Sequence, residues 1–497
     1  MPVNTQHKEY QDNLHQWAIV RDCVTGQIAV QKGGELYLPR PAGQTREDYE
    51  NYQARAVFFD GTSRTAEGLF GHVFTKDPAQ TGADKISDAF KLMLDDVDAS
   101  GTNLDEFVSN ITWDAMQAPW GGILVDHSPV PDGTSVADNK RFAYLKWYSA
   151  EAVYNWRYSF IDGINKLAKV ILREDIETED PADEFSTITT EAYRVLSFDE
   201  NNRYIQRLFV KEDGAEKGFV LAETIYPRMN GEYLDFIPFY TCPGEIPEKS
   251  MLLGLAFENI GHYQKTAEYE NGLFLTSVPT PIAENMEPPT IEKEREYIEN
   301  GIKKTKKEKT PVTMVMGGSK FKFFCQKNSD GSIAAVNVKF LEFSGAGLGQ
   351  LLSALNGCLD RMAKLGIQAI GAEKKGVETA EVAQIHRASE HGVLGAFARA
   401  MSNKITLAVK LMAQWNLPNE DADVWSYQLN TDYNYSELSA QILSIMYTAR
   451  QSDEIPRSVW FDSLKKNEMV PENMTFDEFL KGIEADATGG HGPDGNA

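Results

Sequence analysis

The stretch LLGLAFENIGHYQKTAEYENGLF, residues 252–274, decides the fold because a second stretch of the same kind follows it. It has no proline and repeats apolar or aromatic residues at helical spacing, which predicts a helix of about 22 residues and about 33 Å. Pro279 and Pro281 then end the helix. Residues 345–366, GAGLGQLLSALNGCLDRMAKLG, predict a second helix of about 20 residues. Two helices of similar length therefore enclose the segment 278–343.

The enclosed segment 278–343 is predicted to be a small α/β insert. We expect a charged helix in TIEKEREYIENGIKKTKKEK (290–309), and then strands in PVTMVMG, KFKFFCQ and AAVNVKFLEF. Residues 301–322 hold seven lysines and one glutamate, although the whole chain has a net charge of −24. Such a run is either a solvated face or a docking surface for an acidic partner or for DNA.

The segments after the second helix differ in composition. Residues 366–377 form a linker with three glycines. The longest helical pattern in the chain covers 378–416, about 39 residues, and indicates an elongated scaffold or packing between subunits. Residues 417–497 are strongly acidic. Helices are expected there near SELSAQILSIMYTARQS and SVWFDSLKKNEM, and the final DATGGHGPDGNA is expected to be disordered.

Residues 1–250 are predicted to be an α+β region, which makes the whole chain an α+β protein. Roughly the first 80 residues, including GQIAVQKGGELYLPRP, are expected to hold short strands and turns. TNLDEFVSNITWDAMQA (102–118) predicts a helix capped by Thr102 or Asn103, because its apolar residues repeat on one face. Strands are expected in GILVDH, RFAYLKWYS, KLAKVILRE, EAYRVLSF, RYIQRLFVKE and GFVLAETIYP, with the charged ETEDPADE as a separating segment.

Composition limits the class of protein. With 42% hydrophobic and 25% charged residues over 497 positions, the chain is expected to form roughly two to four globular domains. No stretch of about 18 apolar residues and no signal-peptide pattern occurs, so we expect synthesis in the cytoplasm and no membrane partner. The four cysteines are far apart, which argues against a zinc ribbon or a disulfide framework. The net charge disfavours general DNA coating but is compatible with a channel whose walls do not grip DNA.

No catalytic motif stands out in the sequence. The chain lacks a P-loop and a GxSxG elbow, and His386 and His391 are spaced i, i+5, which puts them on different helix faces. We therefore expect no metal, no cofactor and no ATP-driven motor. The alternative that stays open is a carboxylate-based hydrolase or nuclease. Its candidate residues are Asp95, Asp96 and Asp98, and Asp126 beside His127.

Six short stretches, in the same order along the chain, carry a resemblance to a known family. They are YSAEAVYNWR (148–157), FIPFYTCPG (236–244), IGHYQKTAEYENGLFLTSVPTP (260–281), KFLEFSGAGLGQLLSAL (339–355), ETAEVAQIHRASE (378–390) and NTDYNYSELSAQ (430–441). With the order of the predicted elements, they make the chain resemble the portal proteins of tailed bacteriophages, in one divergent family from phages and prophages. The resemblance spans about residues 60–480.

The resemblance implies a ring of about twelve subunits, made in the host cytoplasm and placed at one capsid vertex of the virion, through which DNA is packaged and later ejected. The implied partners are the terminase large subunit, which carries the motor, head-tail adaptor or neck proteins, major capsid and scaffold proteins, and double-stranded DNA bound without sequence recognition. The implied segments are 1–250 as wing, 251–277 and 344–365 as stem helices, 278–343 as clip, 366–377 as tunnel loop, 378–416 as long wing helix, and 417–497 as crown.

Three sets of residues become functional candidates through this resemblance. The tunnel loop would contact DNA transiently through Lys374 and Lys375, with Gly366, Gly371 and Gly376 allowing movement. The clip would dock partners through Lys303, Lys304, Lys306, Lys307 and Lys309. The stem would pack through Leu252, Phe257, Ile260, Leu351, Leu355 and Leu359. The alternatives are a solvated turn, a solvated helix face and an ordinary core. A third interpretation of the chain is another structural virion component, such as an adaptor or capsid protein.

Overall fold

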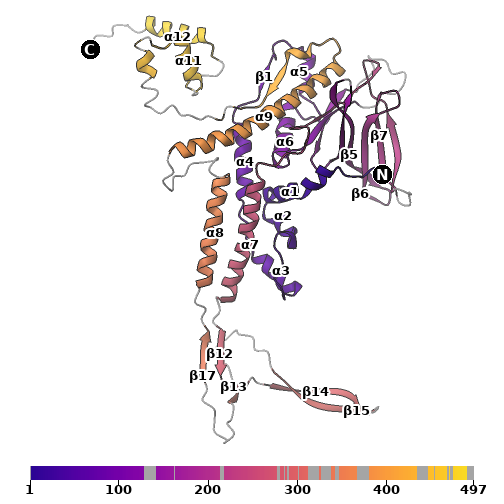
Figure 1. Cartoon of the computed structure of the whole chain (residues 1–497), viewed down its shortest axis with the longest axis vertical. Helices are drawn as coiled ribbons and strands as arrows, with labels where there is room; N and C mark the ends of the chain where they lie inside the picture. The colour runs from indigo at the N-terminus through magenta and orange to yellow at the C-terminus, as the bar shows by residue number, and fades with distance from the viewer. Residues whose placement is uncertain are drawn as a thin grey trace, which may run out of the picture. The chain divides into compact units, whose positions relative to one another are not determined.

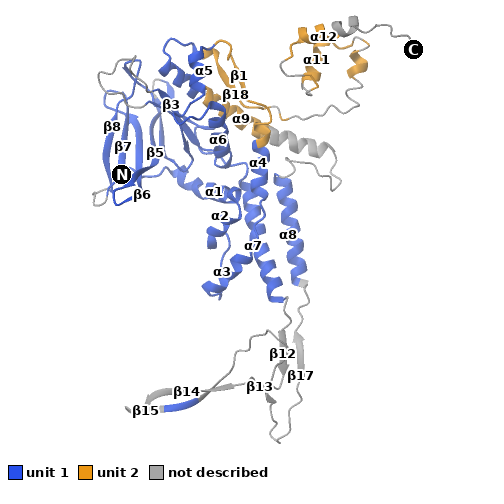
Figure 2. Cartoon of the chain, turned by 180° about the vertical axis from the view of Figure 1, so that it is seen from behind, with its two compact units in different colours: residues 1–70, 86–377, 407–422 blue, residues 71–85, 378–406, 423–497 orange. Residues whose placement is uncertain are grey.

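The computed structural model describes an α+β protein between residues 2 and 489. The residues it does not describe are 1, 128–141, 162, 213–217, 277–279, 285, 288–289, 300–301, 312–323, 326–336, 342–345, 367–379, 432, 434–445, 451, 453, 467–468, 471–473 and 490–497. The chain divides into two compact units, which Figure 2 distinguishes by colour. Unit 1 comprises residues 1–70, 86–377 and 407–422, and unit 2 comprises residues 71–85, 378–406 and 423–497.

The N-terminal part of the chain is helical, so the prediction of short strands and turns there is wrong. It forms α1 (Lys8–Thr25), α2 (Gln27–Lys32), α3 (Arg46–Arg55) and α4 (Gly61–Val73). In GQIAVQKGGELYLPRP, apolar and polar residues alternate over too few positions to distinguish a strand from a short helix. Gly26 ends α1 with a positive φ of 98° and lets the chain turn directly into α2.

Two further helices precede the sheets. They are α5 (Asp88–Leu94) and α6 (Leu104–Gln117). The predicted helix at 102–118 is confirmed as α6, and Asn103 caps it by accepting a hydrogen bond from the Glu106 N–H. The predicted apolar face of α6 is buried.

Two antiparallel sheets form most of the β-structure of unit 1. One has the order β11-β2-β3, from Phe239–Thr241, Gly121–His127 and Ala143–Ser149. The other is a meander of β4 (Val153–Ile161), β5 (Ile164–Asp180), β6 (Asp183–Phe198), β7 (Tyr204–Lys211) and β8 (Phe219–Ile225). The six predicted strands are confirmed, whereas β4 was not predicted as a strand. The segment ETEDPADE does not separate two shorter strands, because β5 and β6 extend into it. A short hairpin, β9 (Arg228–Met229) and β10 (Glu232–Tyr233), follows the meander.

The helix pair predicted from residues 252–274 and 345–366 is confirmed. It consists of α7 (Leu253–Thr276) and α8 (Ala346–Leu365), which lie side by side in Figure 1 and contact each other. One face of α7 joins a hydrophobic cluster with the N-terminal helices. Its buried apolar residues are Leu253, Ala256, Ile260, Tyr263 and Ala267.

The charged stretch 290–309 forms two strands, so the predicted helix is wrong. Strands β14 (Thr290–Glu299) and β15 (Ile302–Pro311) pair as an antiparallel ribbon. Two residues separate them in the sequence, Asn300 and Gly301, and Asn-Gly is the strongest short-range signal for a two-residue hairpin. The mixed charges of residues 290–309 resemble the i, i+4 ion pairs of a helix. However, no apolar residues repeat there at helical spacing.

The other described strands of the insert pair across it. Strands β12 (Thr280–Glu284) and β17 (Asn337–Leu341) form one antiparallel pair, and β13 (Met286–Glu287) and β16 (Phe324–Cys325) form another. The strands predicted in KFKFFCQ and AAVNVKFLEF are thus confirmed, and most of PVTMVMG lies outside the described residues.

The long helix predicted for 378–416 is confirmed as α9 (Ala380–Asn416). Within unit 2, β1 (Ala79–Thr81) pairs with β18 (Ser426–Gln428) after a short 3-10 turn, η3 (Ala422–Val424). The expected helix near SVWFDSLKKNEM is α11 (Arg457–Lys466). A further helix, α12 (Phe476–Gly489), was not predicted and extends into the stretch expected to be disordered. Most of SELSAQILSIMYTARQS lies outside the described residues.

Asn259 is a fully buried polar residue that fixes α7 to the start of α4. Its Oδ1 accepts hydrogen bonds from the Thr62 N–H at 3.0 Å and the Thr62 hydroxyl at 2.9 Å, and its Nδ2 donates to the Phe59 carbonyl at 2.7 Å. All three bonds lie in a region where a lost partner leaves a buried polar group unsatisfied.

We expect Asn259→Leu to lower the free energy of unfolding by about 2–4 kcal/mol, because it strands these buried donors and acceptors. The matched control is Asn110→Leu at an exposed position of α6, which should change stability by less than about 0.5 kcal/mol. Urea denaturation of both variants measures the difference. If both variants lower the free energy of unfolding equally, the hydrogen bonds of Asn259 do not fix α7 to α4.

Candidate assembly surfaces and polar centre

The α7–α8 pair is held by an ion pair and by a buried stripe on α8. Glu258 of α7 and Arg361 of α8 form a salt bridge at 3.0 Å, with a second hydrogen bond from the Arg361 Nε at 3.1 Å. The buried stripe of α8 consists of Leu355, Cys358 and Met362, at spacing i, i+3, i+7. The two helices meet along one face of each, and a second face of α7 is buried against the N-terminal helices. Only the faces outside these contacts are left for solvent or for other chains.

The predicted stem residues differ in their exposure. Leu252, Ile260 and Leu355 are buried within the chain, and Leu351 and Leu359 are half-buried. Phe257 differs, because 52% of its surface is exposed. Other large apolar side chains on the helix pair are similarly exposed. They are Leu273, Phe274, Leu275, Leu352 and Leu365.

Only one of the predicted tunnel-loop residues is described. Gly366 directly follows α8 and is buried. A Cβ at this position would lie 2.6 Å from Thr65 Cγ2 of α4 and 3.2 Å from Leu255 Cδ2 of α7, so a side chain does not fit without a shift. Gly366 is thus a packing position at the end of α8. The other predicted tunnel-loop residues lie outside the described residues; they are Gly371, Lys374, Lys375 and Gly376.

The five candidate docking lysines lie on β15, opposite a strand rich in glutamate. The register places Lys309 opposite Glu292 and Lys307 opposite Glu294, whereas Lys306 faces Arg295. The positive charge of β15, which also includes Lys303 and Lys304, is therefore partly balanced by the glutamates of β14. Lys306 and Arg295 form a like-charged pair in the register. Of these lysines, the side chains of Lys306 and Lys307 are described, and both are exposed.

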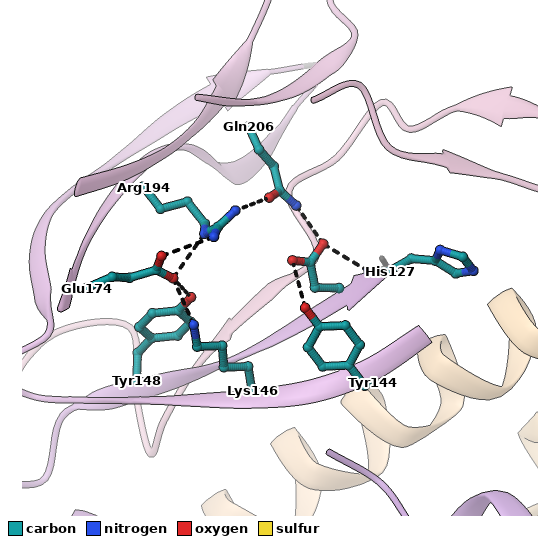
Figure 3. A network of polar contacts seen from close by, with 8 residues as sticks. His127, Tyr144, Lys146, Tyr148, Glu174, Arg194 and Gln206 are labelled. Atoms are coloured by element: carbon teal, nitrogen blue, oxygen red, sulfur yellow. Dashed lines mark hydrogen bonds and ion pairs between the residues drawn. The ribbon is translucent and has the colours of Figure 1, made fainter. Parts of the chain in front are cut away.

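A polar network joins the two sheets of unit 1, as Figure 3 shows. Glu174 of β5 accepts two hydrogen bonds from Arg194 of β6, both at 3.0 Å, one from Lys146 of β3 at 2.9 Å, and one from the Tyr148 hydroxyl. Arg194 also donates to Gln206 of β7 at 3.0 Å. The Glu174 side chain is only 9% exposed.

The surroundings of Glu174 decide its protonation. Burial by itself raises the pKa of this carboxyl, but the hydrogen bonds and charge of Arg194, with the charge of Lys146 and the Tyr148 hydroxyl, outweigh it and lower the pKa to about 2. Glu174 is therefore an ionised anchor rather than a proton donor near neutral pH.

Three of the four carboxylates of the enzyme alternative, Asp96, Asp98 and Asp126, accept hydrogen bonds in local structure. Asp126 Oδ1 accepts from Gln206 Nε2 at 2.7 Å and from the His127 N–H at 2.9 Å. The His127 ring stacks on Trp415, with the ring centroids 5.8 Å apart. Asp126 thus extends the network of Figure 3.

The acidic run before α6 shapes its own loop. Asp98 Oδ1 accepts from the backbone N–H groups of Ser100 and Thr102, and Asp96 Oδ1 accepts from that of Gly101. Burial by itself raises the pKa of Asp98, but hydrogen bonds from the Thr102 side chain and from the backbone N–H groups of Ser100 and Thr102 outweigh it and lower the pKa. Among the described residues, no group of three or more His, Cys, Asp or Glu is arranged to hold a metal ion. Of the helices that the structure describes, none is both long and apolar enough to span a membrane.

Comparisons with known proteins give one family match and distant structural neighbours. Residues 251–416 match a family described as a domain of unknown function (DUF4055). A search of the curated proteins found no match. The region that matches the family, residues 251–416, covers both helices of the pair, the insert and α9.

Two solved structures of gene transfer agent particles are similar to this chain at 10% sequence identity. One is the neck of an empty particle, with a TM-score of 0.36 over 93% of this chain and 99% of that chain. The other is the virion of the native particle, with a TM-score of 0.30 over 95% and 99%. At these values the likeness assigns no function to this chain.

Because the folded state lowers the pKa of Glu174 from its usual 4.5 to about 2, the ionised side chain stabilises the protein above pH 4.5, and this stabilisation is lost as the pH falls toward 2. We expect Glu174→Gln to reduce the free energy of unfolding at pH 7 by about 3 kcal/mol and to reduce its dependence on pH between 4.5 and 2. Denaturant titrations across this range measure both effects. Glu177→Gln, at an exposed position on the same strand, is the control and should leave the pH dependence unchanged. An unaltered pH dependence in Glu174→Gln would rule out the network as its source.

Proposed function

We propose that this chain is a structural virion protein of the portal type, which assembles into a ring at a capsid vertex and serves as the DNA channel. The observation that carries the proposal is the anchored helix pair α7–α8, in which the end of α7 and the start of α8 lie at the same end of the pair (Figure 1). The insert connects these two ends in the sequence. The six sequence stretches that resemble phage portal proteins occur in the order that this architecture requires.

The exposed apolar side chains of the helix pair support packing between subunits. Phe257 and Phe274 are 52% and 53% exposed, and Leu275 is 65% exposed. Burying such side chains against a neighbouring copy is favourable by about 25 cal/mol per Å² of apolar surface. In this proposal Leu252, Ile260 and Leu355 hold the pair to its own chain, whereas Phe257 contacts the next subunit.

The acidic chain suits a channel through which DNA slides. Each phosphate that a protein neutralises adds affinity through counterion release, so a channel that must release DNA needs few such contacts. In the proposal, Lys374 and Lys375 of the tunnel loop make transient phosphate contacts. The ribbon β14–β15 docks the terminase large subunit and later a head-tail adaptor. Major capsid and scaffold proteins surround the vertex.

Two other interpretations have less support. The hydrolase interpretation needs free carboxylates, but Asp96, Asp98 and Asp126 are used by loop and network hydrogen bonds. An adaptor or another capsid component would share the exposed apolar surface, but it does not require an insert carried between two paired helices.

Phe257→Glu tests the stem contact, because it introduces a charge where the proposal places an apolar contact between subunits. We expect the protein concentration for half-maximal ring assembly to rise at least about tenfold, with the monomer fold retained. Native mass spectrometry across a dilution series measures this. Phe142→Glu, at a site that is 64% exposed and outside the helix pair, is the matched control. If both variants assemble like the parent, Phe257 is not at a subunit contact.

The docking role of the ribbon has a separate test. Replacing Lys303, Lys304, Lys306 and Lys307 by Gln should reduce DNA packaging in a reconstituted reaction and leave ring assembly intact, because the ribbon lies outside the helix pair. The control replaces four exposed lysines elsewhere, Lys8, Lys32, Lys85 and Lys249. If the ribbon variant packages DNA like the parent, or if the control loses as much packaging, the ribbon lysines are an ordinary solvated surface without a docking role.

A further inference from the structure

The five-stranded sheet of unit 1 has a hollow of about 370 Å³ on one face. Its floor is apolar and includes Ile171, Val195, Phe209 and Phe219, and the segment Pro2–Thr5 lies along one side. Asn155 of β4 holds that segment by donating from Nδ2 to the Thr5 carbonyl at 2.8 Å. The hollow therefore has a fixed wall on the sheet.

Positive charge gathers at this hollow in a chain that is otherwise acidic. Lys169 and Arg207 line it, and the register puts Arg157 directly opposite Lys169. Burial and the charges of Arg207 and Arg157 lower the pKa of Lys169, which indicates that these cations are close enough to repel one another.

Within the described part of the chain, the cations of the hollow are not paired with an anion. Among the described residues, none of the three forms a salt bridge, and the buried Nε of Arg207 has no hydrogen-bond partner. The Arg207 Nη2 donates only to the Ser197 hydroxyl, at 3.2 Å. A buried guanidinium N–H without a partner is costly, so the hollow is complementary to an anion with an adjacent apolar group.

A matching surface occurs on the same sheet, at the far end of β5 and β6. Beyond Arg173 on β5 and Ala192 on β6 the two strands pair only with each other, because neither β4 nor β7 extends past this point. Glu174 at the base of this part is held by Arg194 and by Lys146 of β3. The outer part, residues 175–190, is a two-stranded ribbon, and such a ribbon has little stability in water unless something packs against it. We call its turn, residues 180–185, the tip.

The tip combines an exposed aromatic ring with uncompensated acids. Phe185 is 90% exposed, the highest value among the exposed large hydrophobic residues described. Asp183 and Glu184 precede it, and no lysine or arginine occurs between residues 174 and 193. Glu184 has no ion pair among the described residues. The tip thus offers the apolar group and the negative charges that the hollow lacks.

The tip cannot enter the hollow of its own chain. Ten residues of the continuous strand β6 separate Phe185 from Val195, which is about 33 Å at 3.3 Å per residue. Both belong to one rigid sheet, so the distance is fixed by the strand itself. A complementary partner for the hollow must therefore come from another molecule.

We propose that the tip of the β5–β6 ribbon inserts into the cationic hollow of a neighbouring copy, with Phe185 on the apolar floor and Asp183 and Glu184 facing Lys169 and Arg207. The contact joins two different surfaces of the same chain, and a contact of that kind closes into a ring when its rotation allows. The inference rests on the proposed ring and adds a contact between sheets to the one between helix pairs.

The test uses the full chain as a mixture of isotopically heavy and light copies, with the photo-cross-linker p-benzoylphenylalanine at position 185. Mass spectrometry of assembled rings should find heavy–light cross-links from position 185 to peptides of residues 155–171 or 195–209. The matched control carries the cross-linker at position 142, another exposed phenylalanine, and should give no cross-links to these peptides.

Charge reversal gives the second arm of the test. Lys169→Glu with Arg207→Glu should lower the cross-link yield at least about tenfold, and adding Asp183→Lys with Glu184→Lys to the same chain should restore most of it. All these positions are at least partly exposed, and circular dichroism checks that each variant folds.

The outcomes separate this inference from the proposed function. Rings that form without heavy–light cross-links to the hollow overturn the inference and leave the ring proposal standing. Stabilisation by inorganic phosphate that depends on Lys169 and Arg207, without such cross-links, assigns the hollow to a small anion and also overturns it. If no ring forms at all, both proposals are contradicted.

Discussion

The burial of one face of α7 is the constraint on which the rest of unit 1 depends. That face packs into the cluster made with α1, α3 and α4, and Asn259 ties it to α4 by three hydrogen bonds. Because the inner face of α7 is used in this way, α8 must pack on a different face, where Glu258 and Arg361 meet. The insert between the two helices is therefore carried by a pair that is anchored in the core of its own chain.

The two sheets of unit 1 depend on a second, polar constraint. The network around Glu174 connects residues of β3, β5 and β6, and through Gln206 it reaches Asp126 on β2. Each buried charge has partners, which is the condition under which a buried polar cluster makes an arrangement specific. Asp126, one of the candidate acids of the hydrolase alternative, therefore has a structural role in this network.

The sequence predicted the long helices well and the short or charged elements poorly. Helices α7, α8 and α9 each repeat apolar residues over many turns, and such a pattern has few other solutions. The ribbon β14–β15 was not predicted because 12 of the 20 residues in its two strands are charged and hide the strand pattern. Only the Asn-Gly pair indicates the hairpin. The N-terminal helices were missed because α2 and α3 are short and their burial depends on α7, which is distant in the sequence.

The candidate site was predictable only in part for a similar reason. Sequence spacing identified apolar positions on the helix pair but could not separate Leu252, buried in the chain, from Phe257, which is half exposed. The hollow on the sheet was not predicted, because Lys169 and Arg207 come together only through the pairing of β5, β6 and β7. No local sequence pattern indicates which strands pair.

The most direct test of the central claim is an image reconstruction of the purified, assembled chain by electron cryo-microscopy. The account predicts a closed ring with a central hole, with α7 and α8 of each copy around that hole and Phe257 at the boundary between adjacent copies. A monomer under all assembly conditions, or an assembly in which the helix pairs do not surround a hole, would contradict it.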